Sequence, residues 1–438
     1  MKQAARFLSV KILNRFEKKN EQLSLVRNQV FSSFKPEQAS KSRAMVLTNE
    51  IVRLKGRLDL MIEFISGRKM ERLDQALRSI LRIGFYEIIY DESIPDYASV
   101  DAAVNLTKDV LNRKASGLTN AVLRNLIRNK DKDKDWDGLL RKNQKWNSIP
   151  GWLQNRWKKQ FGENGFYELI KRINQAPKTF VRVDLSRNNL DDVNQKLKES
   201  GIDAENFSDS FLKIKSGSGK IFSIDLFQLG QISIQDPAAG AIVEFLDPKE
   251  GETILDVCAA PGTKSLYIAE RVGETGKVFA SDFDQSRVNL GKNDLERHGR
   301  KNIEWNVKDA TEDNFPMTDK ILIDAPCTGT GVMGRKPDIR WRRKPKDISD
   351  MATLQMKILK HLSQFLNSGG TLVYGTCSLE PEENWNVVEQ FLKLNTDFRL
   401  QTGASQVQPD WVNDMECLHT FPHVHGVDGL FAARITRS

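Results

Sequence analysis

Two cysteines, Cys327 and Cys377, directly follow hydrophobic runs, in the stretches KILIDAPCTGTG and GGTLVYGTCS. Each run is typical of a buried strand, and the glycines near each cysteine mark the strand's end. A thiolate at an exposed strand end can add to carbon 6 of a cytosine ring, which makes carbon 5 able to accept a methyl group. The reaction also needs an acid near ring nitrogen 3 and a base or release group. One flipped-out base at these two strand ends can meet all three.

The alternative interpretation is that the cysteines are structural, because a free cysteine often behaves as a small buried hydrophobic residue. Cys258 and Cys417 fit that interpretation, although Cys258 also lies in a loop with small residues. Four cysteines in 438 residues do not predict a disulfide scaffold. No C-x-x-C pair occurs and the histidines show no ligand spacing against the cysteines, so we expect no metal site.

A second set of candidate residues follows the strands predicted upstream of Cys327. The first of these strands ends in DVCAAPGTKS, residues 256–265, where small side chains let a ligand approach the backbone. The next two end in acidic residues, Asp282 (with Asp284 as the alternative) and Asp309, which suit a ribose diol and an adenine amino group. The loop at 256–265 is not G-x-G-x-x-G and lacks the P-loop spacing, so the pattern favours S-adenosylmethionine over a dinucleotide.

The elements that must position these residues begin at residue 236. From there strand-like runs alternate with amphipathic helices, which predicts a doubly wound, largely parallel sheet with helices on both faces. The first 130 residues are predicted to be helical, because runs such as RLDQALRSILRIGFYEIIY repeat apolar residues at i, i+3 and i+4. Strands and helices alternate irregularly between about 150 and 230, so the overall fold class is predicted to be α/β.

Three domains are predicted from this organisation. The charge-dense stretch DKDKDWDG, residues 131–138, marks the first boundary because it has little apolar content. The predicted domains are a helical RNA-binding domain at 1–135, linker helices with a small α+β RNA-binding subdomain at 136–235, and a Rossmann-like methyltransferase domain at 236–438.

The net charge of +8 is unevenly distributed along the chain. Residues 1–150 carry 29 Lys and Arg against 18 Asp and Glu, whereas the rest of the chain is mildly acidic. The basic part predicts a polyanion partner, with a well-solvated helical surface as the alternative. No apolar run approaches the roughly 18 residues of a membrane span, and the N-terminus lacks a signal-peptide pattern. We therefore expect a cytoplasmic, monomeric protein without a membrane partner.

Basic residues surround a tryptophan in GRKPDIRWRRKPK, directly after the Cys327 loop. Lysine and arginine bind phosphates and an aromatic ring stacks on a base, so this stretch predicts contact with single-stranded or opened RNA. A solvated charged surface is the alternative. The residues predicted to contact RNA are Arg335, Lys336, Arg340, Trp341, Arg342 and Arg343, with Arg182 as a further candidate.

Several motifs resemble those of a known family. The stretches LDVCAAPGTKS, DAPCTGTG, RKPDIRW and TLVYGTCSLEPEEN, in this order, resemble the RNA cytosine-5 methyltransferase family of the Sun type over roughly residues 150–438. The N-terminal helices, above all GLTNAVLRNLIR, resemble the NusB-like RNA-binding fold. This fusion is similar to bacterial enzymes that methylate one cytosine of small-subunit ribosomal RNA, which implies that this RNA, naked or in an early assembly intermediate, is the substrate.

The resemblance implies a role for each site residue. Cys377 is the nucleophile, Cys327 assists product release, Asp324 touches both the cytosine edge and the cofactor, and Lys264 lies close to the target base. Thr263 replaces a glycine common in the family, for which we expect at most a modest loss of cofactor affinity. The implied cofactor site consists of Cys258, Ala259, Ala260, Pro261, Gly262, Thr263, Lys264, Asp282, Asp309 and Asp324.

Two alternatives stay open. DNA cytosine-5 enzymes use the P-C cysteine as the nucleophile, which would exchange the roles of Cys327 and Cys377. A ribosome-assembly or antitermination factor would bind RNA without turnover, but the complete set of Cys377, Cys327 and Asp324 argues against it. An amino-group methyltransferase is disfavoured, because the chain lacks D/N-P-P-Y/F at the fourth strand.

Overall fold

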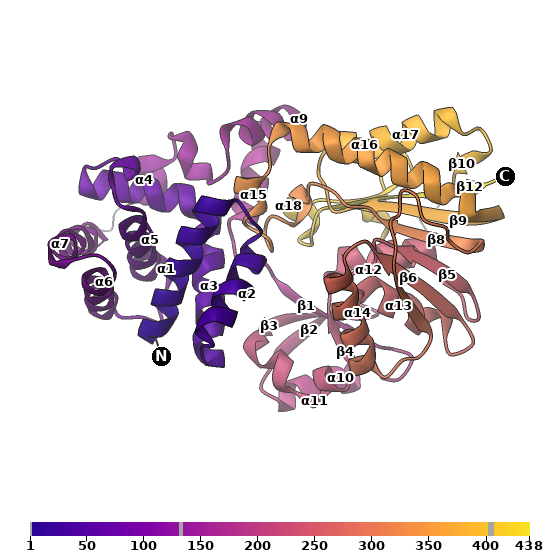
Figure 1. Ribbon diagram of the computed structural model, residues 1–438, viewed down its shortest axis with the longest axis horizontal. Coiled ribbons are helices and arrows are strands. Elements are labelled where there is room, and N and C mark those ends of the chain that lie inside the picture. The colour runs from indigo at the N-terminus through magenta and orange to yellow at the C-terminus, as the bar shows by residue number, and fades with distance from the viewer. Residues whose placement is uncertain (1, 131–134, 402–406) are drawn as a thin grey trace. The chain divides into compact units, whose positions relative to one another are not determined.

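A computed structural model describes residues 2–130, 135–401 and 407–438 (Figure 1). By their contacts the residues form two compact units, residues 1–176 with 333–343 and residues 177–332 with 344–438, each described here by itself. The chain therefore crosses from one unit to the other at three points. Residues 131–134 of the predicted charged boundary lie outside the described part of the chain, and the predicted domain boundaries stay a prediction.

The first unit is built from helices that bury one apolar face each. In α5, Leu77, Ile80 and Leu81 are buried at helical spacing, and the Asp74 carboxylate caps the helix by accepting from the backbone N–H of Ala76 at 2.7 Å. The helices are α1 (Lys2–Lys19), α2 (Leu23–Phe34), α3 (Gln38–Arg53), α4 (Lys55–Ser66), α5 (Gln75–Tyr90), α6 (Asp96–Val110), α7 (Arg113–Lys130), α8 (Trp136–Leu140), α9 (Gly151–Ile173) and α15 (Ile339–Arg342).

The second unit begins with a small antiparallel sheet of order β2-β3-β1-β4. Val193 of α10 packs with Val181 and Leu212 of the sheet in a separate small core. Its strands and helices are β1 (Thr179–Val183), α10 (Leu190–Glu199), β2 (Asp203–Ser208), β3 (Phe211–Ser216), α11 (Asp225–Gln228) and β4 (Ile232–Ile234).

The rest of the second unit is a larger sheet of order β10-β12-β9-β8-β5-β6-β7, with β11 paired to β12. Strands β5 to β9 are parallel, whereas β10, β11 and β12 join antiparallel. The strands are β5 (Thr253–Val257), β6 (Lys277–Asp282), β7 (Ile303–Val307), β8 (Thr318–Asp324), β9 (Leu366–Thr376), β10 (Phe398–Leu400), β11 (Leu418–Thr420) and β12 (Leu430–Arg437).

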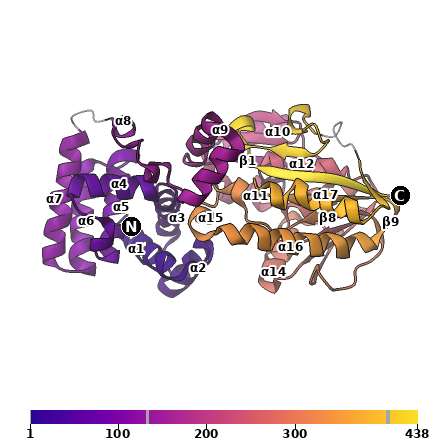
Figure 2. The ribbon, with the colours of Figure 1, turned by 90° about the horizontal axis from the view of Figure 1, so that it is seen from above.

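Helices cover both faces of this larger sheet because successive residues of a buried strand point to opposite sides. Leu322 and Val373 pack toward α12 and α13, whereas Ile321 and Leu372 pack toward α16 and α17. Figure 2 shows α16 and α17 side by side over one face. The covering helices are α12 (Pro237–Leu246), α13 (Thr263–Val272), α14 (Gln285–His298), α16 (Pro345–Leu362) and α17 (Trp385–Leu394), and the short α18 (Pro422–His425) precedes β12.

The predicted fold class is confirmed: helices at the N-terminus, a small α+β sheet and a doubly wound sheet follow one another as expected. The sheet order reverses at β5, with β6 on one side and β8 on the other, so β5 and β8 form the switch point at which such sheets bind ligands. Across the described helices, none combines the length and the apolar character that a membrane crossing requires.

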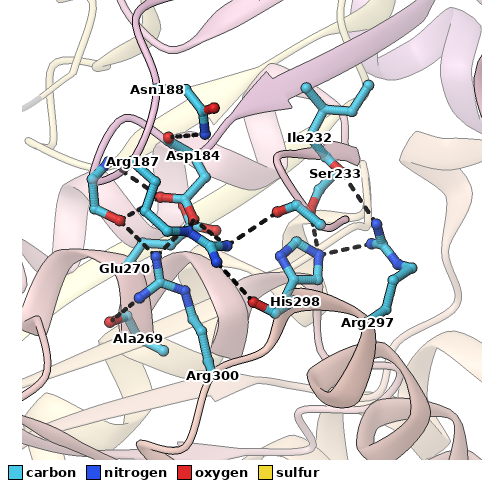
Figure 3. A network of polar contacts seen from close by, with 12 residues as sticks. Asp184, Arg187, Asn188, Ile232, Ser233, Ala269, Glu270, Arg297, His298 and Arg300 are labelled. Atoms are coloured by element: carbon cyan, nitrogen blue, oxygen red, sulfur yellow. Dashed lines mark hydrogen bonds and ion pairs between the residues drawn. The ribbon is translucent and has the colours of Figure 1, made fainter. Parts of the chain in front are cut away.

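A buried polar network joins the small sheet to α14 (Figure 3). The Asp184 carboxylate, 1% exposed as a residue, accepts from Arg187 Nε at 2.8 Å and from Arg300 Nη2 at 2.7 Å. Nearby, His298 Nε2 lies 2.7 Å from Arg297 Nη2 and 3.2 Å from Ser233 Oγ. Arginine can only donate, so Nε2 is an acceptor and the buried imidazole is neutral. Burial, reinforced by the Arg297 charge, lowers the pKa of His298 from 6.5 to about 3.

This histidine predicts acid sensitivity. As the pH falls below 6.5 the unfolded chain takes up a proton that the folded chain refuses, so stability is present above 6.5 and is lost progressively toward pH 3. The loss attributable to His298 is about 2 kcal/mol between pH 6.5 and pH 5. Urea unfolding of His298→Gln, which keeps an acceptor for Arg297, should show a flatter pH dependence. The control His361→Gln should follow the wild type; equal slopes for all three proteins would contradict the assignment.

Candidate active site

The pairing of β8 with β9 brings the two cysteine loops together. The strands are parallel, and Asp324 at the end of β8 lies opposite Gly375 near the end of β9. One more ladder bond follows, from the Ala325 N–H to the Gly375 carbonyl at 2.9 Å. Cys327 lies two residues after Ala325, and Cys377 lies two residues after Gly375. Both loops therefore leave the sheet at the same edge.

The sulfurs of these two cysteines lie 3.2 Å apart, close enough for one thiol to hydrogen-bond to the other sulfur. Behind them the Gly331 N–H donates to the Cys377 carbonyl at 3.0 Å, and the Gly429 N–H donates to the Gly331 carbonyl at 3.0 Å. A Cβ added to Gly331 would lie 2.0 Å from the Gly429 carbonyl oxygen. The second glycine of CTGTG is therefore required by this close approach.

An ion pair lies beside the sulfurs. Lys264 Nζ, from the first turn of α13, donates to Asp324 Oδ2 at 2.8 Å. Burial acts to lower the pKa of Lys264, but the Asp324 carboxylate and the neighbouring Cys377 outweigh it, and the pKa is raised. Lys264 therefore stays a cation, available to stabilise negative charge on Cys377.

The cofactor loop follows β5 and is tied to β6. The backbone N–H of Ala260 donates to Asp282 Oδ2 at 3.2 Å, and Arg287 pairs with the same carboxylate at 3.1 Å. Asp284, the alternative to Asp282, is instead the N-cap of α14 and accepts from Ser286 N at 2.7 Å. This arrangement favours Asp282 as the ribose ligand, because it is at the tip of β6 and is not used as a helix cap.

The remaining residues of the predicted cofactor loop lie between β5 and the first turn of α13. Cys258 directly follows β5 with a φ of 61°, and burial, with the charges of Asp282 and Asp324, raises the pKa of its thiol. The Cys258 thiol is therefore held in its neutral form, and its role in the loop is structural. Ala259, Ala260, Pro261, Gly262 and Thr263 lead into α13, and Gly262 (φ 109°) leaves no room for a Cβ, which would lie 2.7 Å from Trp305.

Asp309 lies after β7. Its Oδ1 accepts from the Thr311 N–H at 2.8 Å and from the Thr311 hydroxyl at 2.7 Å, which lowers its pKa. Oδ2 takes part in none of the described hydrogen bonds. One carboxylate oxygen thus shapes the turn, and the other can accept from an adenine amino group.

A buried carboxylate that the sequence interpretation missed tests whether S-adenosylmethionine fits. Asp256 in β5 is fully buried, its Oδ2 accepts from Ser265 Oγ at 2.6 Å, and its Oδ1 has no partner among the described residues. Burial raises its pKa to about 7. An orphaned carboxylate beside Asp282 and Asp324 suits a cofactor with an ammonium and a sulfonium charge, so the residues present fit this cofactor.

The predicted RNA contact of Arg182 is wrong. Its side chain is fully buried, ion-pairs with Glu270 through Nη2 at 2.9 Å, and lies 4.2 Å from the ring centroid of Tyr267. Its Nε donates to Gln235 at 2.7 Å. Every part of the guanidinium is therefore used to join β1 to α13 inside the second unit.

The predicted RNA contact of Arg340 is also wrong. The residue is fully buried, and its guanidinium donates to the carbonyls of Arg53 (2.9 Å) and Ile173 (3.0 Å) and to Asn174 Oδ1 (2.6 Å). Trp341 is half-buried, and its Nε1 donates to the Val52 carbonyl at 2.8 Å. Residues 333–343 thus belong to the core of the helical unit.

The other members of this basic stretch differ in exposure. Arg342 pairs with Asp338 at 3.1 Å and is mostly buried at its side chain. Arg335 and Arg343 are half-buried, and Lys336 is exposed. Of the predicted RNA-binding residues, Lys336 is thus the one whose charge faces solvent most fully.

Two further residues were missed. Phe283 directly follows Asp282 and is 75% exposed, the place where an aromatic ring can stack on adenine. Glu383 is fully buried next to both cysteine loops. An acid within the apolar run ETILDV, an aromatic in ASDFD and the acid pair in EPEEN were signals for Asp256, Phe283 and Glu383 respectively. The described residues hold no cluster of side chains with metal-ligand geometry.

Comparison with known proteins assigns the chain. Residues 243–436 match the 16S rRNA methyltransferase RsmB/F, residues 3–128 the NusB family, and residues 149–217 the ferredoxin-like domain of RsmF/B-like methyltransferases. The ribosomal RNA small subunit methyltransferase B of Photorhabdus laumondii is 33% identical over 88% of both chains. The chain belongs to the RsmB/F family. The corresponding Serratia proteamaculans protein is 31% identical over 91% of both chains.

The RsmB/F family consists of S-adenosylmethionine-dependent methyltransferases of 16S rRNA. The family assignment made from the sequence motifs, including the N-terminal NusB-like domain, is therefore confirmed. The crystal structure of PH0851 shares the architecture, with a TM-score of 0.79, 26% identity and 99% of both chains covered. This RsmB/F chain is therefore an enzyme whose cofactor class follows from its family.

The close approach at Gly331 yields a prediction. Gly331→Ala should displace the Cys327 loop from the Cys377 loop, because the added Cβ would meet the Gly429 carbonyl oxygen at 2.0 Å and the Cys377 carbonyl oxygen at 3.0 Å, both of them backbone atoms. A reagent that bridges neighbouring thiols should link Cys327 to Cys377 in the wild type and fail in the variant, as read by peptide mass spectrometry. The matched control is Gly334→Ala, whose Cβ meets nothing within 4 Å. Unchanged bridging in Gly331→Ala would refute the geometry.

Proposed function

We propose that this RsmB/F enzyme transfers a methyl group from S-adenosylmethionine to carbon 5 of a specific cytosine in 16S rRNA, through a covalent bond between Cys377 and the base. The 3.2 Å approach of two thiols beside the Lys264–Asp324 ion pair is the observation that supports this proposal. The cofactor supplies an electrophilic methyl group when bound. We also propose that the enzyme acts as a monomer in the cytoplasm.

Cys377 is proposed as the nucleophile because its surroundings stabilise a thiolate. The Lys264 ammonium faces it, and the Cys327 thiol can donate a hydrogen bond to its sulfur. The thiolate pair of electrons forms the bond to carbon 6, and Lys264 provides the proton that nitrogen 3 gains. Asp324 accepts from the exocyclic amino group of cytosine, which orients the ring.

Cys327 is proposed to complete the reaction. Once the Cys377 sulfur is bonded to carbon 6 of the base, this sulfur carries no charge. The negative charge that opposed ionisation of Cys327 has then been removed. After carbon 5 has gained the methyl group, Cys327 loses its proton to solvent, and its thiolate takes the remaining proton from carbon 5. The electron pair of that C–H bond restores the ring double bond, nitrogen 3 returns its proton to Lys264, and the bond from Cys377 to carbon 6 breaks. The thiol thus regenerated hydrogen-bonds to the departing Cys377 sulfur.

The cofactor is proposed to lie at the ends of β5, β6 and β7. Asp256 and Asp282 hold its ammonium and ribose, Asp309 accepts from adenine, and the loop from Cys258 to Lys264 passes close to it. Lys336 is proposed as an RNA contact, together with the half-buried Arg335 and Arg343.

Replacement of the two cysteines should give different results. Cys377→Ala should abolish 5-methylcytosine formation in 16S rRNA, because no adduct forms. Cys327→Ala should accumulate a covalent protein–RNA adduct, because the carbon 5 proton is not removed. Denaturing gels and nucleoside mass spectrometry separate these outcomes. Cys417→Ala, which removes a buried cysteine outside the site, is the control, and an exchange of the two phenotypes would reverse the assigned roles.

Phe283→Ala should raise the KM for S-adenosylmethionine about tenfold with little change in kcat, because stacking of a base on an aromatic ring contributes about 1–3 kcal/mol. Initial rates at saturating RNA measure the effect. Phe222→Ala, which removes a 59% exposed ring from the small α+β region, should leave the KM at its wild-type value. An unchanged KM in Phe283→Ala would place the adenine elsewhere.

A further inference from the structure

A single buried carboxylate, that of Glu383, joins the two cysteine loops. It lies in a short helical turn, Pro381–Glu383, just after the Cys377 loop. Its Oε2 accepts from the backbone N–H of Thr328 at 2.7 Å, and its Oε1 accepts from the Ser378 hydroxyl at 2.6 Å and from the Thr328 hydroxyl. Thr328 follows Cys327 and Ser378 follows Cys377, so the same side chain holds the residue next to each sulfur.

The rest of the Glu383 surroundings is equally fixed. Gln355 of α16 donates through Nε2 both to Glu383 Oε2 at 3.1 Å and to the Pro326 carbonyl at 2.9 Å. The Tyr374 hydroxyl donates to the Glu383 carbonyl at 2.6 Å. All of these side chains are fully buried. Four donors directed at one carboxylate are the arrangement expected for its charged form, although burial raises its pKa.

Two thiols at 3.2 Å cannot both carry a charge at low cost, so their surroundings decide which one ionises first. The ionisable groups that face Cys327 are Tyr374 of β9, Cys377 directly after β9, and Glu383 of the helical turn. Hydrogen bonding to Cys377, burial, and the charges of Cys377 and Glu383 raise the pKa of Cys327 well above its usual value. Cys377, in contrast, faces the Lys264 cation.

We propose that Glu383 is a positioning residue that decides which cysteine attacks: its carboxylate locks the Cys327 loop to the Cys377 loop and keeps Cys327 a thiol while Cys377 is a thiolate. The inference rests on the proposed covalent mechanism for its catalytic meaning. Glu383 touches neither the substrate nor the cofactor in this account, because it lies behind the loops. Its influence passes through Thr328 and Ser378.

The first test measures the two thiols directly, without turnover. Iodoacetamide labelling from pH 6 to pH 10, followed by peptide mass spectrometry, gives a separate rate profile for each cysteine. In the wild type Cys327 should label only at a pH well above Cys377. In Glu383→Gln the Cys327 profile should move to lower pH by about one unit, because a nearby negative charge is lost. Glu383→Asp keeps the charge on a shorter side chain and should retain most of the wild-type separation.

The second test measures catalysis. Glu383→Gln should lower kcat at least about tenfold while both KM values stay within about twofold, because a glutamine amide presents N–H groups to donors that need an acceptor. Thr328→Val should reproduce part of this loss, whereas Thr328→Ser, which keeps the hydroxyl, should recover wild-type kcat. Glu87→Gln is the matched control: Glu87 is a buried carboxylate of the helical unit that accepts from Ser99 Oγ at 3.1 Å.

Each outcome decides something. The inference is overturned if Glu383→Gln leaves the Cys327 labelling profile and kcat unchanged, or if Glu87→Gln changes them to the same extent, because the effect would then be one of general stability. A wild-type enzyme that forms no 5-methylcytosine would defeat the proposed function. The labelling profiles would still test Glu383 in that case, since they need neither RNA nor cofactor.

Discussion

The parallel pairing of β8 with β9 is the constraint on which the site depends. Register places Asp324 opposite Gly375, and the sulfurs that follow end 3.2 Å apart. A slip of one residue would displace the loops by about 3.3 Å, as large as the separation itself, and would turn each side chain to the other face. Parallel strands supply this arrangement because their carboxyl ends lie at one edge, where two loops can serve one substrate.

Charge divides the molecule in a way that matches its two ligands. The net charge of +8 comes from the N-terminal part of the chain, whereas the edge of the larger sheet gathers Asp256, Asp282 and Asp324 around Lys264. A polyanion is attracted by the first and a cationic cofactor by the second. Burial, reinforced by these carboxylates, raises the pKa of the Cys258 thiol and so disfavours its thiolate.

The sequence predicted what depends on pattern along the chain. Alternation of strands and helices indicated the doubly wound sheet, and the positions of Asp282, Cys327 and Cys377 after apolar runs placed them at one edge. The larger errors concern Arg182 and Arg340, because an arginine looks the same in the sequence whether it meets phosphate or buried protein groups. Only the fold brings Glu270 to Arg182 and the carbonyls of Arg53 and Ile173 to Arg340. Asp256 and Glu383 were missed for the same reason, since their partners come from distant segments.

The return of residues 333–343 to the helical unit has a consequence for how the protein can change. These residues begin two positions after Gly331, and Arg340 and Trp341 donate hydrogen bonds to the carbonyls of Ile173 and Val52 in the helical unit. Removing the N-terminal helices would leave the buried side chains of residues 333–343 without their partners. Replacing the helices with another module would require a new surface that matches this segment. We therefore expect the sequences of the two units to change together, and not to be exchanged separately by recombination.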